Sequence, residues 1–215
     1  MACTMKEHQD IISGENSYLN WSVAQLPMSG ESVSGDSYLV RYYGNQTLVA
    51  VSDGLGHGEE ALNASQRAFQ YLETFSGQSL ISLVQLCHKQ LRETRGVVMN
   101  LALFDNAEQS LTWMGIGNIE GMLFRAGEHE NEKVDNILLR GGVVGYKLPM
   151  LRASMMSVSP GDTLVFTTDG VSIDYEQVVD ASWTPELIAG HIASRYFKPS
   201  DDALVLAACY KGGKR

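Results

Sequence analysis

Cysteines and long apolar runs are both scarce in this chain. The three cysteines, Cys3, Cys87 and Cys209, are odd in number and share no metal-ligand spacing. This excludes a disulfide framework and a cysteine-rich zinc site, and is typical of reduced thiols in a cytosolic protein. The longest apolar runs, such as Ala203–Tyr210, are strand-sized and too short to span a membrane. The N-terminal stretch MACTMKEHQDII lacks the apolar segment of a signal peptide. We therefore expect a cytoplasmic protein that has no membrane partner.

Basic residues are also in short supply. Sixteen Lys and Arg stand against 25 Asp and Glu, which gives a formal net charge of −9. Nucleic-acid phosphates are bound by clustered Lys and Arg, and the only dense basic stretch is the tail Lys211–Arg215, so we expect no nucleic-acid partner. An acidic excess is compatible with bound divalent cations.

No Pro/Ser-rich linker, low-complexity segment or charge block divides the sequence. We expect a single domain over residues 1–215, with a core from about 18 to 211 and frayed ends. Hydrophobic periodicity and turn residues predict the elements. The expected strands are Asn20–Gln25, Ser37–Tyr43, Thr47–Ser52, Gly96–Phe104, Ser110–Gly115, Glu120–Arg125, Ile137–Leu139, Met150–Val158, Thr163–Thr168 and Ala203–Tyr210. The expected helices are Glu59–Phe75, Ser79–Thr94 and Thr184–Tyr196. Grouped helices and strand meanders favour an α+β layered sandwich.

Two strands of the sequence end alike. The segment TLVAVSDG at 47–54 is matched by TLVFTTDG at 163–170, so each apolar strand ends in a small hydroxyl residue and an Asp-Gly pair. The strand fixes where Asp53 or Asp169 emerges, and the glycine lets the chain turn sharply without a side chain in the way. Asp-Gly alone is common turn chemistry. The matched strands before both pairs favour a functional site.

Further acidic residues stand where two other strands begin. Asp36 leads into Ser37–Tyr43, and Asp201-Asp202 precedes Ala203–Tyr210. In antiparallel pairing the end of one strand lies beside the start of its neighbour. Asp53 and Asp169 are therefore expected to meet Asp36 and Asp201 at one edge of the sandwich.

Gathered carboxylates require a counter-charge. Like charges about 4 Å apart repel by roughly 1–4 kcal/mol per pair at realistic effective dielectrics. All-oxygen ligation favours hard ions, so Mg²⁺ or Mn²⁺ is expected rather than zinc or copper, and the exposed carbonyl of an Asp-Gly turn is a further oxygen ligand. Two such ions can activate a water for attack on phosphorus without a Ser, Cys or His nucleophile.

These motifs resemble those of the protein phosphatase 2C (PPM) superfamily, and most closely its compact bacterial branch of sporulation and stress-response phosphatases. The matching segments occur in family order between Ser34 and Val205. They are Ser34-Gly35-Asp36-Ser37, Val51–Gly58, Gly115-Ile116-Gly117-Asn118, Thr167–Val171 and Asp201–Val205.

The resemblance implies a four-layer αββα sandwich of two antiparallel sheets flanked by helices, with two Mn²⁺ or Mg²⁺ ions at one end. By position, Asp53 would bridge both ions, Asp169 and Asp201 would bind the second, and Asp36 would hold metal or its waters. The Gly54 carbonyl would be a further ligand. The implied activity is hydrolysis of phosphoserine or phosphothreonine on a bacterial signalling protein. A phosphorylated STAS-domain protein of the stressosome is the expected substrate and partner.

Three further residues are possible outer contacts of this site. Asp202 stands where the wider family commonly has Asn. Many members carry a proton-donating His directly after Asp-Gly, where this chain has Leu55, and His57 follows two residues later. Asn118 is open to two interpretations, a hydrogen bond at the active-site edge or the stabilisation of a turn. No phosphate-binding Arg is evident near the N-terminus.

Two other functions remain open from the sequence. One is a histidine-kinase-like ATP-binding protein, because the segment 53–58 resembles an Asp-x-Gly-x-Gly loop; this would leave Asp169-Gly170 unexplained. The other is a noncatalytic regulator with a phosphatase fold. Against it, a protein without metals has no reason to keep mutually repelling carboxylates.

Overall fold

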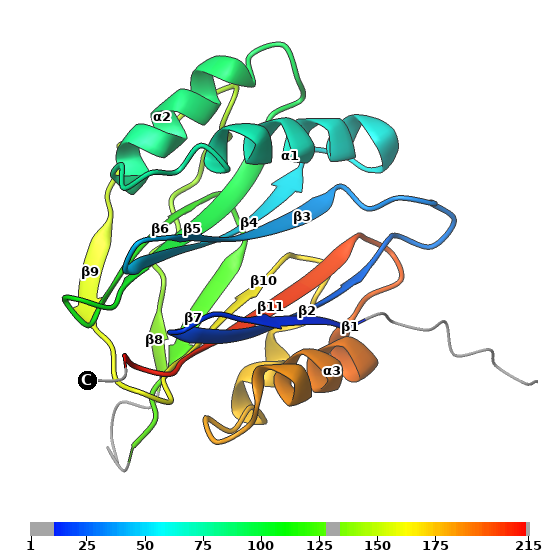
Figure 1. The fold of residues 1–215 in the computed structure, drawn as a ribbon. Helices are drawn as coiled ribbons and strands as arrows, with labels where there is room; N and C mark the ends of the chain where they lie inside the picture. The colour runs from blue at the N-terminus through cyan, green and yellow to red at the C-terminus, as the bar shows by residue number, and fades with distance from the viewer. Residues whose placement is uncertain (1–10, 128–133, 214–215) are drawn as a thin grey trace, which may run out of the picture.

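The computed structural model describes residues 11–127 and 134–213. Two antiparallel sheets lie face to face (Figure 1). The first sheet has the order β1-β2-β11-β10-β7-β8 and the second has the order β3-β4-β5-β6-β9. The strands are β1 (Ile11–Glu15), β2 (Leu19–Leu26), β3 (Asp36–Tyr43), β4 (Gln46–Gly54), β5 (Val97–Asp105), β6 (Ser110–Ile116), β7 (Glu120–Phe124), β8 (Val134–Asn136), β9 (Ser154–Ser157), β10 (Thr163–Thr167) and β11 (Ala203–Tyr210).

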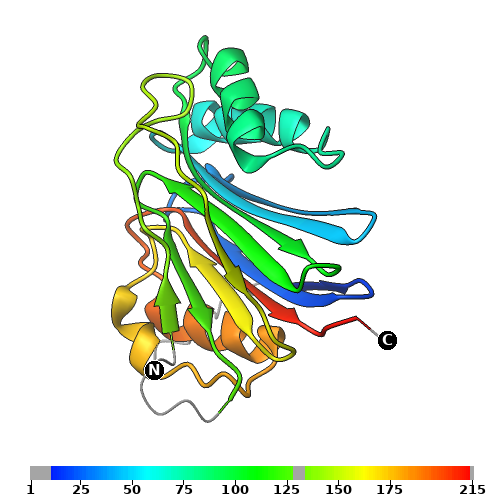
Figure 2. The ribbon, with the colours of Figure 1, turned by 90° about the vertical axis from the view of Figure 1, so that its left-hand side faces the viewer.

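Helices cover the outer face of each sheet. The helices α1 (Gly58–Leu72) and α2 (Leu80–Gln90) pack on the sheet of β3 to β9, and α3 (Pro185–Tyr196) packs on the other sheet beside the short 3-10 helix η1 (Ile173–Gln177). The turned view shows the four layers in order (Figure 2). The predicted four-layer αββα sandwich is therefore confirmed, with one α-helix and η1 on the second face.

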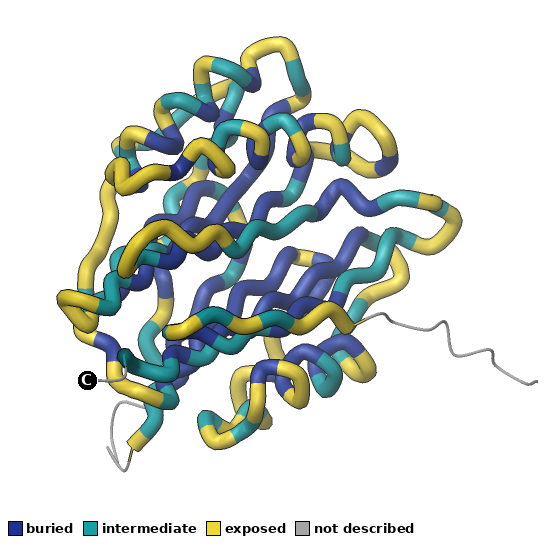
Figure 3. The backbone as a smooth tube through the Cα atoms, viewed as in Figure 1, coloured by how far each residue is buried: buried dark blue, intermediate teal, exposed yellow. Residues whose placement is uncertain are grey.

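Apolar residues form three clusters between these layers. The central cluster fills the space between the sheets and includes Val51, Phe104 and Phe166, all at most 1% exposed. The central strands β4, β5, β10 and β11 are buried along most of their length, whereas the edge strands β1 and β9 are mostly exposed (Figure 3). Burial on both faces explains why β4 and β10 are continuous apolar runs instead of alternating patterns.

The helices begin where the sequence predicts. The Ser79 side chain accepts a hydrogen bond from the Ser82 N–H at the start of α2, and Thr184 accepts one from Leu187 at the start of α3. Pro185 occupies the first turn of α3, where its missing N–H costs nothing. α1 buries a stripe of small and apolar side chains, namely Ala61, Ala64, Ala68, Phe69 and Leu72.

Some predicted elements are wrong in position or length. The strand expected at Ile137–Leu139 is formed by Val134–Asn136 instead, because Ile137 turns into the core (7% exposed) while Leu138 is 65% exposed. The strand expected at Met150–Val158 is shortened to Ser154–Ser157. β1 pairs with β2 and lies N-terminal to the expected core, and the sequence analysis did not predict it.

The structure also describes the state of two cysteines and the length of the helices. Cys87 is buried and Cys209 is partly buried, and both are free thiols; Cys3 lies outside the described residues. None of the helices formed by the described residues is long and apolar enough to cross a membrane.

Candidate metal centre

Asp36 and Asp53 are direct partners across the β3–β4 ladder. Opposite residues of an antiparallel pair project to the same face, with Cβ atoms about 4.5–5.5 Å apart. Asp36 is 1% exposed, and Asp53 is partly buried. The register alone therefore brings together two carboxylates that are 17 positions apart in the sequence, by subtraction of their numbers.

Thr168 joins this pair to the other sheet. Its hydroxyl donates to Asp36 Oδ2 at 2.7 Å, and its Oγ1 accepts from the Leu204 N–H at 2.8 Å. The Thr168 N–H donates to the Leu204 carbonyl at 3.0 Å. Asp169 follows directly and is exposed at the edge of the sandwich. The ends of β4 and β10 and the starts of β3 and β11 thus meet at one edge, on the right in Figure 1.

Asp201 and Asp202 differ in what their carboxylates contact. Asp202 is 4% exposed, and its two oxygens accept from the N–H groups of Met28 and Gly35, each at 2.8 Å. Asp201 is partly exposed and accepts from the Asp202 N–H at 2.9 Å. Asp202 therefore holds the loop between β2 and β3 on the start of β11, while Asp201 keeps an oxygen for another contact.

Burial and neighbouring negative charges raise the pKa of Asp36, Asp53 and Asp201. Burial raises the pKa of Asp36 well above its usual range, and the negative charge of Asp53 adds to the effect. Burial, followed by the charges of Asp169, Asp201 and Asp202, raises the pKa of Asp53 to about 7. Burial and the charge of Asp169 also raise the pKa of Asp201. These effects place five carboxylates in one electrostatic region.

The donor set of this region fits a hard cation. Asp36 Oδ1 is buried, and among the described residues it has no hydrogen-bond partner. A buried carboxylate oxygen without a partner is costly, and a divalent cation bound by oxygen ligands would relieve that cost. Within residues 11–127 and 134–213, no three His, Cys, Asp or Glu side chains are arranged to hold an ion as they stand.

Both Asp-Gly glycines are required by close packing. A Cβ on Gly54 would collide with the Ala61 backbone in α1, and a Cβ on Gly170 would collide with the Asp202 backbone. Neither glycine is among the described glycines with positive φ. The expected need for a position without a side chain is therefore confirmed, and its reason is steric. Each glycine lets another segment of the site approach closely.

Of the three outer residues predicted from the sequence, Asn118 and Asp202 contact this edge, whereas His57 contacts Glu31. The Asn118 amide donates to Asp169 Oδ2 at 2.8 Å, which favours the active-site interpretation over a turn. His57 Nδ1 lies 2.7 Å from Glu31 Oε1, and its side chain is 59% exposed. No hydrogen bond within the described residues joins His57 to the aspartates.

Two residues of this edge were missed by the sequence analysis. Thr168 entered the sequence analysis only within the repeated strand and the segment Thr167–Val171, with no role of its own. Its counterpart in the other repeat, Ser52, has a buried hydroxyl without a hydrogen-bond partner among the described residues. Lys198 Nζ donates to the Asp169 carbonyl at 2.7 Å, and its charge lowers the pKa of Asp201. The sequence signal that could have identified Lys198 is its position, because a basic residue three positions before Asp201 can lie near the same carboxylates.

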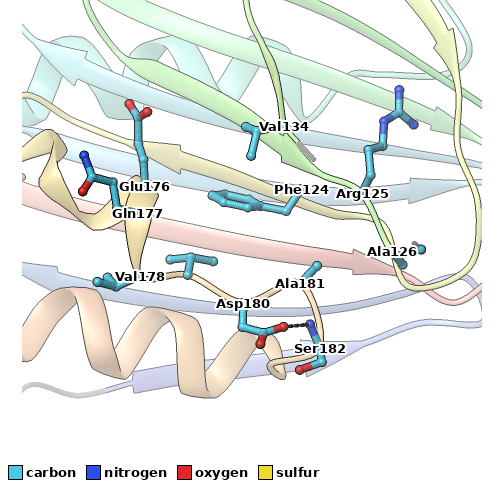
Figure 4. Close-up of a pocket in the computed structure, with 12 residues that line it drawn as sticks. Phe124, Arg125, Ala126, Val134, Glu176, Gln177, Val178, Asp180, Ala181 and Ser182 are labelled. Carbon is cyan, nitrogen blue, oxygen red and sulfur yellow. Dashed lines mark hydrogen bonds between the residues drawn. The ribbon is translucent and has the colours of Figure 1, made fainter. Parts of the chain in front are cut away.

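A cavity of about 600 Å³ lies outside this edge, between β7, β8 and the segment that leads from η1 to α3 (Figure 4). Phe124 and Val178 line it, together with Arg125, whose guanidinium is bound by Asp135 and Asp162. None of the site residues predicted from the sequence lines this cavity.

The chain resembles known proteins over most of its length. Residues 43–211 match the family described as Stage II sporulation protein E (SpoIIE). The phosphoserine phosphatase RsbX of Bacillus subtilis (strain 168) is 23% identical over 74% of this chain and 78% of its own length. Stage II sporulation protein E of Priestia megaterium is 24% identical over 69% of this chain, which covers 26% of that relative.

Solved structures of other proteins share the fold of this chain. A chain from a study of the bacterial stressosome superposes with a TM-score of 0.80 at 28% identity, covering 88% of this chain and 98% of the other. RsbX in complex with magnesium superposes with a TM-score of 0.84 at 20% identity, covering 94% and 100%. The catalytic domain of the serine/threonine phosphatase PstP with two manganese ions has a TM-score of 0.65 at 17% identity, covering 90% and 99%. Magnesium and manganese are the ions that the sequence predicts.

The family match and the phosphoserine phosphatase relative identify the chain as a phosphatase of the protein phosphatase 2C superfamily, and its two-sheet sandwich has the fold of that superfamily. The chain belongs to the Stage II sporulation protein E family of this superfamily. The predicted superfamily and the prediction of a metal-dependent protein phosphatase are confirmed. The alternatives of an ATP-binding protein and of a noncatalytic regulator are not supported.

Proposed function

We propose that this chain removes phosphate from phosphoserine or phosphothreonine on a STAS-domain component of a bacterial stressosome, in the cytoplasm. The named activity of the relative RsbX supports the choice of phosphoserine. The similarity to a chain studied as part of the bacterial stressosome supports the choice of partner, and its identity exceeds that of the RsbX structure.

Two Mn²⁺ or Mg²⁺ ions are proposed as cofactors. The proposed ligands are the carboxylates of Asp36, Asp53, Asp169 and Asp201 and the carbonyl of Gly54. When bound, the ions supply Lewis acidity that activates a water and offsets charge on the phosphate. The observation that carries this proposal is the convergence of the carboxylates: Asp36 is paired with Asp53 across the strands and bound to Thr168.

Residues around the proposed ligands fix their positions. Thr168 orients the Asp36 carboxylate by donating to one of its oxygens, and Asn118 does the same for Asp169. Lys198 binds the backbone carbonyl of Asp169 and so holds the turn itself. Such outer contacts orient metal ligands before the ion arrives. Asp202 secures the loop that leads into Asp36.

Phosphate release measured with and without metal tests this function. The purified chain is expected to hydrolyse a small aryl phosphate and a phosphoserine peptide with Mn²⁺, and to lose turnover with a chelator or with Asp53→Asn. Asp105→Asn is the matched control, because Asp105 ends β5 away from the candidate centre and accepts hydrogen bonds from the Ala107 and Glu108 N–H groups and the Gln46 side chain. Equal turnover by the wild type and Asp53→Asn would overturn the proposal.

The partner assignment needs a separate assay. A phosphorylated STAS-domain protein is expected to be dephosphorylated faster than an unrelated phosphoprotein at equal concentration. Equal rates on both substrates would reject the STAS-domain assignment while leaving the phosphatase activity in place.

A further inference from the structure

Two arginines line one cavity beside the candidate metal centre. The cavity has a volume of about 340 Å³ and lies at the outer end of the β6–β9 pair. Its lining includes the arginines Arg140 and Arg152, the apolar residues Trp113 and Leu138, and Ser154. We call it the Arg140–Arg152 pocket. Leu138 is 65% exposed, so part of the apolar lining is open to a ligand.

Neither guanidinium has a charged partner among residues 11–127 and 134–213. Within the described residues, the side chains of Arg140 and Arg152 have no ion pair and no hydrogen bond, whereas Arg95 and Arg125 both pair with carboxylates. Two positive charges on the wall of one cavity repel each other, and an anion between them would relieve that repulsion. Guanidinium groups bind carboxylates and phosphates through paired N–H donors.

Backbone contacts connect this pocket to the candidate centre. The Arg140 carbonyl accepts from the Gly117 N–H at 2.9 Å, and the next residue, Asn118, donates to Asp169. Arg152 precedes β9, whose first residue Ser154 pairs with Trp113, the middle residue of β6. Because the pairing is antiparallel, the chain before Ser154 continues toward the Gly117 end of β6. The pocket and the aspartates therefore open at the same edge of the sandwich.

The strand order sets the distance between them. β6 and β9 are the second and third strands from β4, which carries Asp53. Adjacent strands lie about 4.8 Å apart, so the pocket is roughly 10–14 Å from Asp53 across the sheet. The register adds up to about 13 Å along the strands, because Asp53 pairs with Val98 while Trp113 pairs with Ala102, four residues further along β5. The combined separation is roughly 12–19 Å, and an extended peptide at about 3.3 Å per residue covers it in about four to six residues.

We infer that the Arg140–Arg152 pocket binds an anionic side chain of the protein substrate, about four to six residues from the phosphorylated residue. The inference rests on the proposed function, which places the phosphate at the aspartates. The ligand chemistry is a carboxylate or a second phosphate. Its local attraction matters because the chain as a whole carries −9 and repels acidic partners at long range.

Phosphoserine peptides with a changed flank test the inference. One series carries Asp or phosphoserine about four to six residues before or after the scissile phosphoserine, and the reference peptide carries Ala at each of these positions. The wild type is expected to show a KM lower by about three- to tenfold for an anionic flank, as for a partly exposed charge pair. Comparison of the Asp and phosphoserine arms identifies the anion. Equal KM values for the anionic and the Ala peptides would overturn the inference.

Variants connect that preference to the two arginines. Arg140→Gln combined with Arg152→Gln should remove the difference in KM while kcat and turnover of a small aryl phosphate stay unchanged. Arg41→Gln is the control, because Arg41 is exposed on β3 and does not line the pocket. A double Arg→Glu variant should prefer a peptide with a Lys flank. A double Gln variant that keeps the preference, or that loses aryl phosphate turnover equally, would contradict the inference.

Binding measurements separate this inference from the proposed function. If no phosphopeptide is hydrolysed by any variant, calorimetry with the unphosphorylated acidic peptide decides the question. Weaker binding to the double Gln variant than to the wild type and Arg41→Gln would support the pocket even without phosphatase activity. Equal binding to all three proteins would reject it.

Discussion

The Thr168 hydroxyl donates a hydrogen bond of 2.7 Å to the buried Asp36 carboxylate and thereby joins the two sheets at the candidate centre. This contact connects residues 132 positions apart in the sequence. It stabilises the charge of Asp36 against the burial that raises its pKa.

Thr168→Val should weaken both the fold and the proposed metal site. The loss of a donor to a buried carboxylate is expected to cost about 1–3 kcal/mol in the free energy of unfolding. Thr167→Val is a matched control, because its hydroxyl faces Tyr175 on the helix side of the same strand. Both variants should unfold at lower denaturant concentration. Only Thr168→Val should need more Mn²⁺ for half-maximal activity, and an equal shift in both would contradict the assignment.

Asp53→Asn should stabilise the metal-free protein. Burial and three neighbouring aspartates disfavour the Asp53 charge, and a neutral amide of the same size removes that cost. We expect the free energy of unfolding at pH 8 with a chelator to rise by roughly 1–4 kcal/mol. The upper end corresponds to the difference of about three units between the folded and unfolded pKa of Asp53, at about 1.4 kcal/mol per unit. Urea denaturation of Asp53→Asn against Asp105→Asn measures the effect. A loss of stability would show that Asp53 is not under repulsion in the metal-free fold.

The stability of the metal-free protein should fall as the pH rises from 5 to 8. The pKa of Asp53 is about 7 in the fold, and that of an unfolded Asp is about 3.9. Because the folded pKa is raised, the folded chain keeps a proton that the unfolded chain has released. The contribution of the protonated Asp53 to the free energy of unfolding is fully present below about pH 4 and is lost as the pH rises through about 7. Denaturation at several pH values with a chelator should show this decline, with a smaller slope in Asp53→Asn. Equal slopes would exclude Asp53 as the source.

Saturating Mn²⁺ should raise the melting temperature of the wild type. A ligand that binds only the folded state at 100 times its Kd stabilises it by about 2.7 kcal/mol. For a chain of this size, that corresponds to a shift of about 5–10 °C. The shift should be smaller in Asp169→Asn and unchanged in Asp105→Asn. The absence of any shift at millimolar Mn²⁺ would count against the proposed metal site.

Asn118→Ala should weaken metal binding and leave the fold intact. The Asn118 amide holds Asp169 from an exposed position, so little packing is lost. Removal of such an outer contact typically costs about 10- to 100-fold in metal affinity or activity. Titration of activity with Mn²⁺ measures the change. Asn118→Asp should be worse than Asn118→Ala, because it adds a like charge next to Asp169.

Much of the fold followed from local patterns. The apolar runs of β4 and β10, the caps Ser79 and Thr184, and the turn residues between strands are properties of short segments. The edge strand β8 was misplaced because Ile137 and Leu138 both read as strand residues, although one packs in the core and the other is 65% exposed. A choice between such neighbours depends on what packs against them.

The sequence by itself determined which carboxylates stand at the ends and starts of strands, and hence which residues could gather around a cation. The tertiary structure alone decided how they are used. It pairs Asp36 with Asp53, commits both oxygens of Asp202 to loop amides and turns His57 toward Glu31. The physical reason is that strand-end positions follow from local apolar pattern, whereas the partner of each polar atom depends on register and packing between segments far apart in the chain.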